Sequence, residues 1–169
     1  MQLHPVDFKN LSPEIFQVFL KNNALLTAGN KECCNTMTIG WGQMGTLWNL
    51  PICTVYVRPE RYTYQFMEAH DYFTVSVLAK EDREISRVCG TGSGRETDKI
   101  KACGLTVQYG AGEAPYFEEA ELVLVCRKLY RAPLVEEGFL DREVLEDCYP
   151  ERDLHDMYIG QITKVFVRE

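Results

Sequence analysis

The sequence predicts a mainly β protein with short helices, arranged as a barrel or a sandwich. Six or more runs of apolar and β-branched residues have the length of strands, and only short segments with helical spacing stand among them. No repeat, low-complexity tract or linker interrupts the chain, so residues 1–169 are expected to form a single domain. A doubly wound parallel sheet needs longer helices between its strands, and this pattern therefore excludes it.

A short helix is predicted near the start of the sequence. Ser12 is a favoured N-cap, Pro13 suits the first helical position, and apolar residues recur at helical spacing as far as Leu20. Four more short helices are expected further along the chain. Their predicted ranges are Tyr64–Ala69, Asp82–Cys89, Glu96–Cys103 and Asp141–Asp147.

The first two strands are predicted to form a hairpin. Ala24–Ala28 is a compact apolar run, Asn35–Trp41 alternates, and Gly29-Asn30 between them favours a turn. A third strand, Ile52–Val57, should stop at Arg58, because the proline that follows pushes this residue toward extended geometry. The remaining predicted strands are Tyr72–Leu78, Leu122–Cys126 with a continuation toward Tyr130, and Tyr158–Val167.

The composition limits the class of function. The chain has 25 acidic and 18 basic side chains and a net charge of −7, which argues against binding to nucleic acids or anionic membranes. Neither a signal-peptide run nor a membrane-spanning segment is visible, so we expect a cytoplasmic protein. Seven cysteines without a C-x-x-C pair indicate reduced thiols rather than zinc ligands or disulfides, and only the vicinal Cys33-Cys34 pair is a redox candidate.

Three polar segments are candidates for a functional site, and the first is Arg58-Pro59-Glu60-Arg61-Tyr62-Thr63. It lies where the predicted sequence of elements changes from strand to helix. Two guanidinium groups, a hydroxyl and the free N–H groups of a helix start would suit a phosphate in an otherwise acidic protein. A solvated turn whose arginines pair with surface acids explains the same residues, and spacing alone favours that alternative slightly.

The second segment, Cys89–Lys99, is rich in glycine. Its three glycines let backbone amides approach an anion, and Ser93 with Glu96 has the spacing of a capping box for the next helix. Arg95 and Lys99 are four residues apart and would share one helical face. The segment lacks the Gly-Lys-Ser/Thr of a P-loop and the spacing of a dinucleotide fingerprint, so a plain flexible loop explains it about as well.

The third segment is Asn35-Thr36-Met37-Thr38, together with Trp41. Amide and hydroxyl groups beside a sulfur and an indole suit a planar heteroaromatic ring with polar edges, although an ordinary hairpin remains the favoured explanation.

His155 precedes the last predicted strand, where a lone histidine is more often a surface or capping residue than a catalyst. No Ser/His/Asp or Cys/His grouping and no metal-ligand spacing is visible, so no metal site is expected.

Together these segments resemble the flavoredoxin-like branch of the flavin reductase family. The matching stretches are Asn35–Trp41, Tyr56–Thr63, Cys89–Lys99 and His155–Ile162, in this order and with fitting gaps over roughly residues 20–167. Each motif is modest, but four of them in one order are fairly specific. The resemblance implies an FMN-binding split β-barrel and a homodimer that holds the flavin near the subunit interface.

The resemblance also implies roles for individual residues. The strand Thr36–Thr38 would border the ring and the ribityl chain, and His155 would lie near the ring as the catalytic residue. The full implied set for FMN binding is Asn35, Thr36, Met37, Thr38, Trp41, Arg58, Arg61, Tyr62, Thr63, Ser93, Gly94, Arg95 and Lys99. Much of the wider family has Pro-x-Ser-x-Thr where this chain has Arg61 in place of the serine. The arginine strengthens the phosphate interpretation and places this chain away from the two-component monooxygenase reductases of the family.

Three functions remain open at this point, because all need the same FMN cradle. The first is an FMN-dependent flavin reductase-type oxidoreductase that passes electrons from NAD(P)H to flavin, a metal or a protein. The second is a flavoredoxin-like electron carrier between protein partners. The third is a non-catalytic FMN-binding domain. Hydride transfer through a flavin needs no catalytic triad or metal, because the ring carries the chemistry and the protein supplies position and electrostatics.

Overall fold

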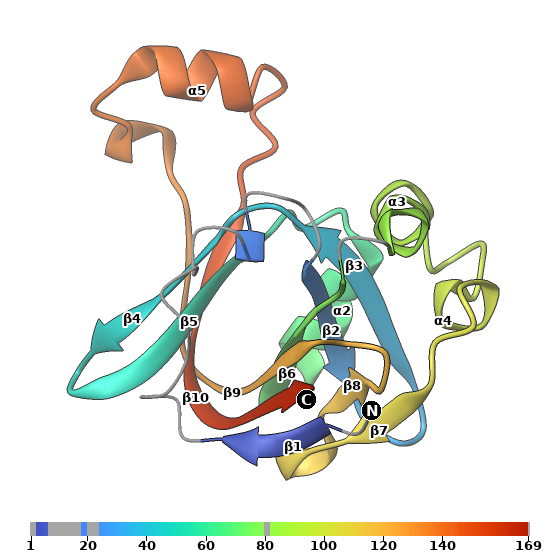
Figure 1. The fold of residues 1–169 in the computed structure, drawn as a ribbon. Helices are drawn as coiled ribbons and strands as arrows, with labels where there is room; N and C mark the ends of the chain where they lie inside the picture. Colours follow the sequence, from blue (N-terminus) through green and yellow to red (C-terminus); the bar gives the residue numbers. More distant parts are fainter. Residues whose placement is uncertain (1–2, 7–17, 20–23, 80–81, 169) are drawn as a thin grey trace.

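A computed structural model describes residues 3–6, 18–19, 24–79 and 82–168. In these ranges one large antiparallel sheet curls around an apolar core, and short helices lie outside it (Figure 1). The predicted fold class, mainly β with short helices, is therefore confirmed. The predicted start of the first helix at Ser12 lies outside the described residues. Within the described ranges, no helix is both long and apolar enough to cross a membrane.

Eight strands of the described part of the chain form the large sheet. Its order is β3-β2-β6-β9-β10-β5-β4, and β1 pairs with β10 beside this path. The strands are β1 (Leu3–Val6), β2 (Ala24–Gly29), β3 (Cys34–Ile39), β4 (Gly42–Leu47), β5 (Leu50–Val57), β6 (Tyr72–Val77), β9 (Leu122–Pro133) and β10 (Asp156–Arg168). A separate ribbon pairs β7 (Val107–Tyr109) with β8 (Pro115–Phe117). Since β3 and β4 stand at the two ends of the sheet order, each has one edge outside this ladder.

The predicted hairpin is confirmed, since β2 and β3 pair antiparallel with Ala28 opposite Asn35. Asn30 closes the turn between them, where its side-chain oxygen accepts the N–H groups of Glu32 at 2.9 Å and Cys33 at 3.1 Å. Strand β4 was not predicted. Its sequence, GQMGTL, contains two glycines and only one β-branched residue, and pairing with β5 along its whole length overrides that weak local preference.

Over the continuous described stretches 24–79 and 82–168, four α-helices lie on the outside: α2 (Tyr62–Ala69), α3 (Arg83–Thr91), α4 (Lys99–Ala102) and α5 (Arg142–Cys148). The predicted helix Glu96–Cys103 is wrong at its start. Ser93 does not cap a helix with Glu96; its carbonyl accepts the N–H groups of Glu96 and Thr97 in a turn. Asp98 is the actual N-cap, and its carboxylate accepts the Lys101 N–H at 3.1 Å.

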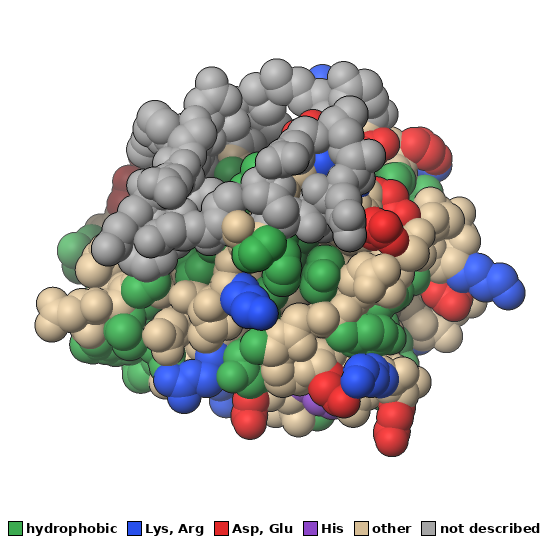
Figure 2. All heavy atoms as spheres, turned by 60° about the horizontal axis from the view of Figure 1, so that its bottom comes forward, with side chains coloured by type: hydrophobic (Ala, Val, Ile, Leu, Met, Phe, Trp, Pro, Cys, Tyr) green, Lys and Arg blue, Asp and Glu red, His purple; other side chains and the backbone are tan. Residues whose placement is uncertain are grey.

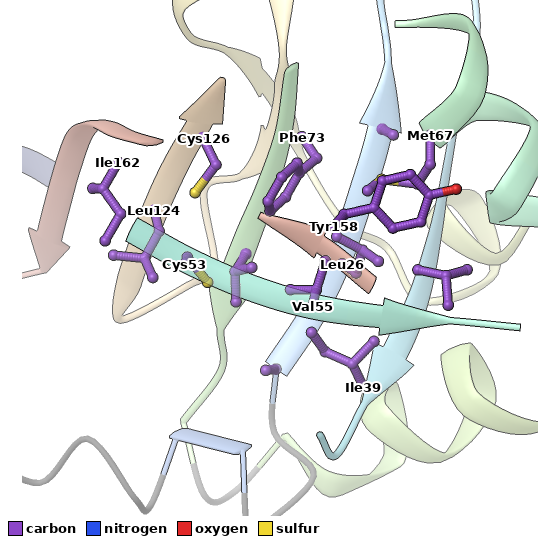
Figure 3. Close-up of a cluster of buried hydrophobic side chains, with 14 of the residues drawn as sticks. Leu26, Ile39, Cys53, Val55, Met67, Phe73, Leu124, Cys126, Tyr158 and Ile162 are labelled. Atoms are coloured by element: carbon purple, nitrogen blue, oxygen red, sulfur yellow. The ribbon is translucent and has the colours of Figure 1, made fainter. Parts of the chain in front are cut away.

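The core lies inside the curled sheet, where side chains from both halves of the chain meet (Figure 3). Leu26, Val55 and Phe73 are fully buried there, together with Tyr158. The Tyr158 hydroxyl donates to the Glu68 carboxylate at 2.7 Å, so its polar end is satisfied while the ring packs in the core. On the face in Figure 2, acidic and basic side chains lie interspersed among hydrophobic ones.

Residues 134–155, here called the arm, leave the sheet between β9 and β10 and carry α5 away from the barrel (Figure 1). The base of the arm is closed by the Leu134 N–H, which donates to the His155 carbonyl at 2.9 Å. Eight acidic and only two Arg or Lys side chains fall in this stretch. Most of the net negative charge of the chain is therefore concentrated in the arm.

Candidate functional site

A cleft of about 330 Å³ lies between the start of α2, the end of α3 with the loop that follows it, and strand β3. We call it the α2–α3 cleft. It brings together most of the residues predicted from the sequence. Those that line it are Asn35, Met37, Arg61, Tyr62, Thr63, Ser93, Gly94, Arg95 and Lys99. Three segments that are far apart in the sequence therefore form one site.

The α2 helix begins at the cleft because Pro59 ends the preceding strand. The Arg61 N–H donates to the Arg58 carbonyl at 3.0 Å, and the Arg61 carbonyl accepts the Tyr64 N–H at 2.9 Å. Arg61 is the extended N-cap residue, and no side chain caps this first turn. The partial positive charge of a helix start thus adds to the charge of Arg61.

Three cationic side chains surround the cleft. Lys99 is buried, and its Nζ donates to the Cys89 carbonyl at 3.1 Å. Burial lowers the pKa of Lys99, and the nearby charge of Arg61 also acts to lower it. The guanidinium of Arg95 stacks over the Tyr62 ring at 5.1 Å. Among the described residues, no carboxylate forms an ion pair with any of the three, so an anion is the natural partner of this charge.

The wall of the cleft is held by a contact between β3 and α2. The amide Nδ2 of Asn35, which is buried, donates to the Thr63 hydroxyl at 2.7 Å. Gly94 packs against this pair so closely that a Cβ there would lie 2.0 Å from Asn35 Oδ1 and 2.7 Å from the Tyr62 ring. Only glycine therefore allows the loop to close on the cleft in this form.

Two predicted residues on β3 face elsewhere. The Thr36 hydroxyl is fully buried and donates to the Leu26 carbonyl at 3.2 Å. The Thr38 hydroxyl donates to the Ser86 carbonyl at 2.5 Å, against α3. Neither side chain lines the cleft, because alternate residues of a strand point to opposite faces. Their roles in cofactor binding stay a prediction.

The other three predicted residues form a second group at the base of the arm. The His155 ring lies 5.0 Å from the Trp41 ring, and its Nδ1 is 2.8 Å from the Tyr149 hydroxyl. Arg58 pairs with Asp153 and lies over the Tyr149 ring at 5.5 Å, so its guanidinium is engaged with the arm rather than with the α2–α3 cleft. Placing Arg58 beside Arg61 at the cleft is therefore not supported by the geometry.

Two other expectations about the site need correction or extension. Arg95 and Lys99 do not share a helical face, because Arg95 lies in the turn before α4 and only Lys99 is helical. Tyr149, the hydrogen-bond partner of His155, was missed. It ends a short helix within an acidic stretch of the sequence, and no local pattern there indicates that the arm folds back onto His155.

Burial lowers the pKa of His155 to about 4, and the Arg58 charge contributes to the same shift. The imidazole is therefore neutral near pH 7. When the Tyr149 O–H donates to Nδ1, the ring proton lies on Nε2, which is then available as a donor.

Comparisons with known proteins agree with this architecture. The family described as "Flavin reductase like domain" matches residues 17–169. A flavoredoxin from Methanosarcina acetivorans superposes with a TM-score of 0.68 at 25% identity, over 86% of this chain and 68% of that one. An FMN-binding domain of a flavin reductases-like enzyme from Shewanella baltica OS155 has a TM-score of 0.68 at 16% identity, over 98% and 76%.

An NADH:FAD oxidoreductase from Streptomyces globisporus C-1027 is similar at a TM-score of 0.64 and 19% identity, over 86% of this chain and 74% of its own. A comparison with curated proteins found no match. The fold is thus that of the flavin reductase-like split barrels. Because the family match covers nearly the whole sequence, the chain belongs to the flavin reductase like family.

Proposed function

We propose that this protein binds FMN in the α2–α3 cleft and works as a flavin-dependent oxidoreductase. The observation that carries the proposal is the gathering of Arg61, Arg95 and Lys99 around one cleft without a carboxylate partner among the described residues. A terminal phosphate supplies the anion that this arrangement lacks. FMN ends in a single phosphate monoester, which fits three cations gathered at one place.

The residues present fit FMN in two further respects. Ser93 adds a hydroxyl at the cationic end, and Gly94 leaves room for backbone to approach a ligand closely. At the other wall, Asn35 and Met37 come from β3, which ends the sheet order. An edge strand offers backbone N–H and C=O groups to the polar rim of a flavin ring.

When bound, the flavin supplies the chemistry of hydride and electron transfer. The side chains around it bind and orient. Arg61, Arg95 and Lys99 hold the phosphate, and the contact between Asn35 and Thr63 keeps β3 and α2 at a fixed separation. His155 does not line the cleft. Its imidazole is neutral, and in the tautomer in which the Tyr149 O–H donates to Nδ1, the proton on Nε2 can be donated to an acceptor atom.

For the reaction, we propose electron transfer from NAD(P)H to flavin or another acceptor. The relative named as an NADH:FAD oxidoreductase supports this choice. A flavoredoxin-like carrier that works between protein partners is the second candidate, and the similarity to the Methanosarcina flavoredoxin at 25% identity favours it. Both candidates use the same cleft and differ in the electron donor.

Two measurements test the proposal. In the first, the purified protein is denatured and the nucleotide that it releases is identified by chromatography. FMN is expected. A colourless protein that also fails to bind added FMN would reject the proposal. The loaded protein is then mixed anaerobically with NADH and with NADPH while flavin absorbance is followed. Rapid bleaching with turnover identifies the enzyme, and bleaching only with a low-potential protein donor identifies the carrier.

We also propose that the protein is a cytoplasmic homodimer. Trp48 and Tyr130 are each about half exposed, and their ring centroids lie 6.3 Å apart at the end of the β4–β5 hairpin. Exposed aromatic rings at a sheet end are typical of surfaces that association covers. Light scattering should report twice the chain mass of 19.4 kDa at micromolar concentration, and a monomer would contradict the dimer.

A further inference from the structure

A second cleft, of about 390 Å³, lies between the arm and the base of the β4–β5 hairpin. We call it the arm cleft. It shares no lining residue with the α2–α3 cleft. The residues that matter for its chemistry are Trp41, Gln43 and Tyr56 on the hairpin side and Phe139, Val144 and Tyr149 on the arm side.

Aromatic rings form the walls of the arm cleft. The rings of Trp41 and Phe139 meet the ring of Tyr149 from two directions, at 6.0 Å and 5.7 Å, both in edge-to-face geometry. Tyr149 is itself buried, whereas Trp41 is 45% exposed. An accessible indole beside two further rings is suited to stacking with a planar aromatic molecule.

The charge of the arm cleft selects against ions. Among the described residues that line it, none carries a charged side chain. The nearest cation described beside the lining, Arg58 against the Tyr149 ring, is already paired with Asp153, and the acidic residues of the arm would repel a ligand phosphate or carboxylate. A cationic ligand would find no carboxylate in the lining to pair with. An uncharged molecule avoids both costs.

The cleft does offer one polar pair. Gln43 Nε2 donates to the Tyr56 hydroxyl at 2.7 Å. Because the hydroxyl accepts this bond, its own proton is free to be donated to a ligand oxygen. Burial raises the pKa of Tyr56, so the phenol keeps that proton at neutral pH.

We propose that the arm cleft is a binding site for an uncharged, planar aromatic molecule of one or two rings that bears a hydroxyl or carbonyl oxygen. The ring stacks on Trp41, and the oxygen accepts the proton of Tyr56. Trp41 then serves this site rather than the cofactor. The inference goes beyond the proposed flavin function, because no residue of the α2–α3 cleft takes part in it.

The test follows Trp41 fluorescence in a Trp48→Phe protein, which leaves Trp41 as its one tryptophan. The flavin-free protein is titrated with 1-naphthol and, separately, with 1-naphthoate, its anionic counterpart. We expect saturable quenching by 1-naphthol and an affinity at least about tenfold lower for 1-naphthoate, since its charge has no partner in the cleft. Equal affinities, or quenching without saturation, would overturn the proposal.

A matched pair of variants locates the bound probe. Val144 is 46% exposed and lines the cleft, so Val144→Phe fills the space without disturbing the core, and 1-naphthol binding should fall at least about tenfold. Leu140 is 99% exposed on the same arm and does not line the cleft, so Leu140→Phe should leave binding unchanged. An equal loss in both variants, or in neither, would place the probe elsewhere.

The Trp48→Phe protein also distinguishes two competing occupants of the arm cleft, FMN and a second copy of the chain. If FMN added in excess displaces 1-naphthol, the indole belongs to the cofactor site and the separate site is rejected. If a second copy of the chain fills the cleft, Trp41 will be shielded from acrylamide at high protein concentration and exposed on dilution. That result would also reject the arm cleft as a ligand site. Flavin binding is read independently from flavin absorbance, so failure of the arm-cleft proposal leaves the proposed function testable.

Discussion

Arg61 contributes its charge at the start of α2, and its replacement by alanine is the most direct test of the proposed phosphate site. Among the described residues it has no carboxylate partner that would already neutralise it. A charge-assisted hydrogen bond contributes about 1.5–3 kcal/mol. That range corresponds to roughly 10- to 150-fold in dissociation constant. Because Arg61 is exposed to solvent, we expect the lower part of this range, about 10- to 30-fold weaker FMN binding.

The assay is a titration of the apoprotein with FMN, followed by flavin fluorescence, with riboflavin as the internal control. Riboflavin lacks the phosphate and should bind Arg61→Ala and the unmodified protein with similar affinity. A matched control variant is Arg87→Ala, since Arg87 is exposed on α3, pairs with Glu84 and does not line the cleft. Unchanged FMN affinity in Arg61→Ala, or an equal loss for riboflavin, would refute the phosphate assignment.

Three further predictions concern the cleft and His155. Gly94→Ala should weaken FMN binding, because the added Cβ would clash with Asn35. Gly45→Ala is the control, since no atom lies within 4 Å of its added Cβ, and isothermal titration with FMN should show unchanged affinity there. His155→Ala should slow flavin reduction in stopped flow more than it lowers FMN affinity, and equal rates would make His155 a structural residue. Since the pKa of His155 falls to about 4 on folding, acid favours the unfolded chain, so stability should be lost as pH falls from about 6.5 toward 4. Because His155 is partly exposed, the loss in free energy of unfolding should be no more than about 1 kcal/mol. The measurement is the urea midpoint at pH 7 and at pH 5, and the two midpoints should differ less in His155→Gln than in the unmodified protein.

The sequence predicted the strands whose side chains fill the core, because burial imposes a regular pattern on them. β2, β6 and the first half of β9 are apolar runs or alternate strictly, and each lies where it was expected. The second half of β9, from Arg127 to Pro133, is mostly polar and was only partly foreseen. It forms because β10 pairs with it beyond the core, a long-range contact that leaves no periodicity in the sequence.

The difference between local patterns and long-range contacts also explains which site residues could be assigned to the cleft from the sequence. Arg61, Ser93, Gly94 and Lys99 follow local rules, since proline and glycine fix where strands and helices end and so bring their neighbours to the cleft. The side chain of Arg58 obeys no such rule. It stands three residues before Arg61, yet it reaches Asp153, far along the chain. Only the return of the arm onto the barrel brings that carboxylate close.

The arm therefore determines how the two clefts are related. Arg58 comes from the segment that begins the α2–α3 cleft, but its ion pair with Asp153 and its contact with the Tyr149 ring bind it to the wall of the arm cleft. Its charge also contributes to the lowered pKa of His155. A movement of the arm would shift Arg58 and His155 together while Lys99, held at the Cys89 carbonyl, stays in place. The charge of Arg61 at the start of α2 also acts to lower the pKa of His155, so the protonation of His155 should respond both to the arm, through Arg58, and to the cationic end of the α2–α3 cleft, through Arg61.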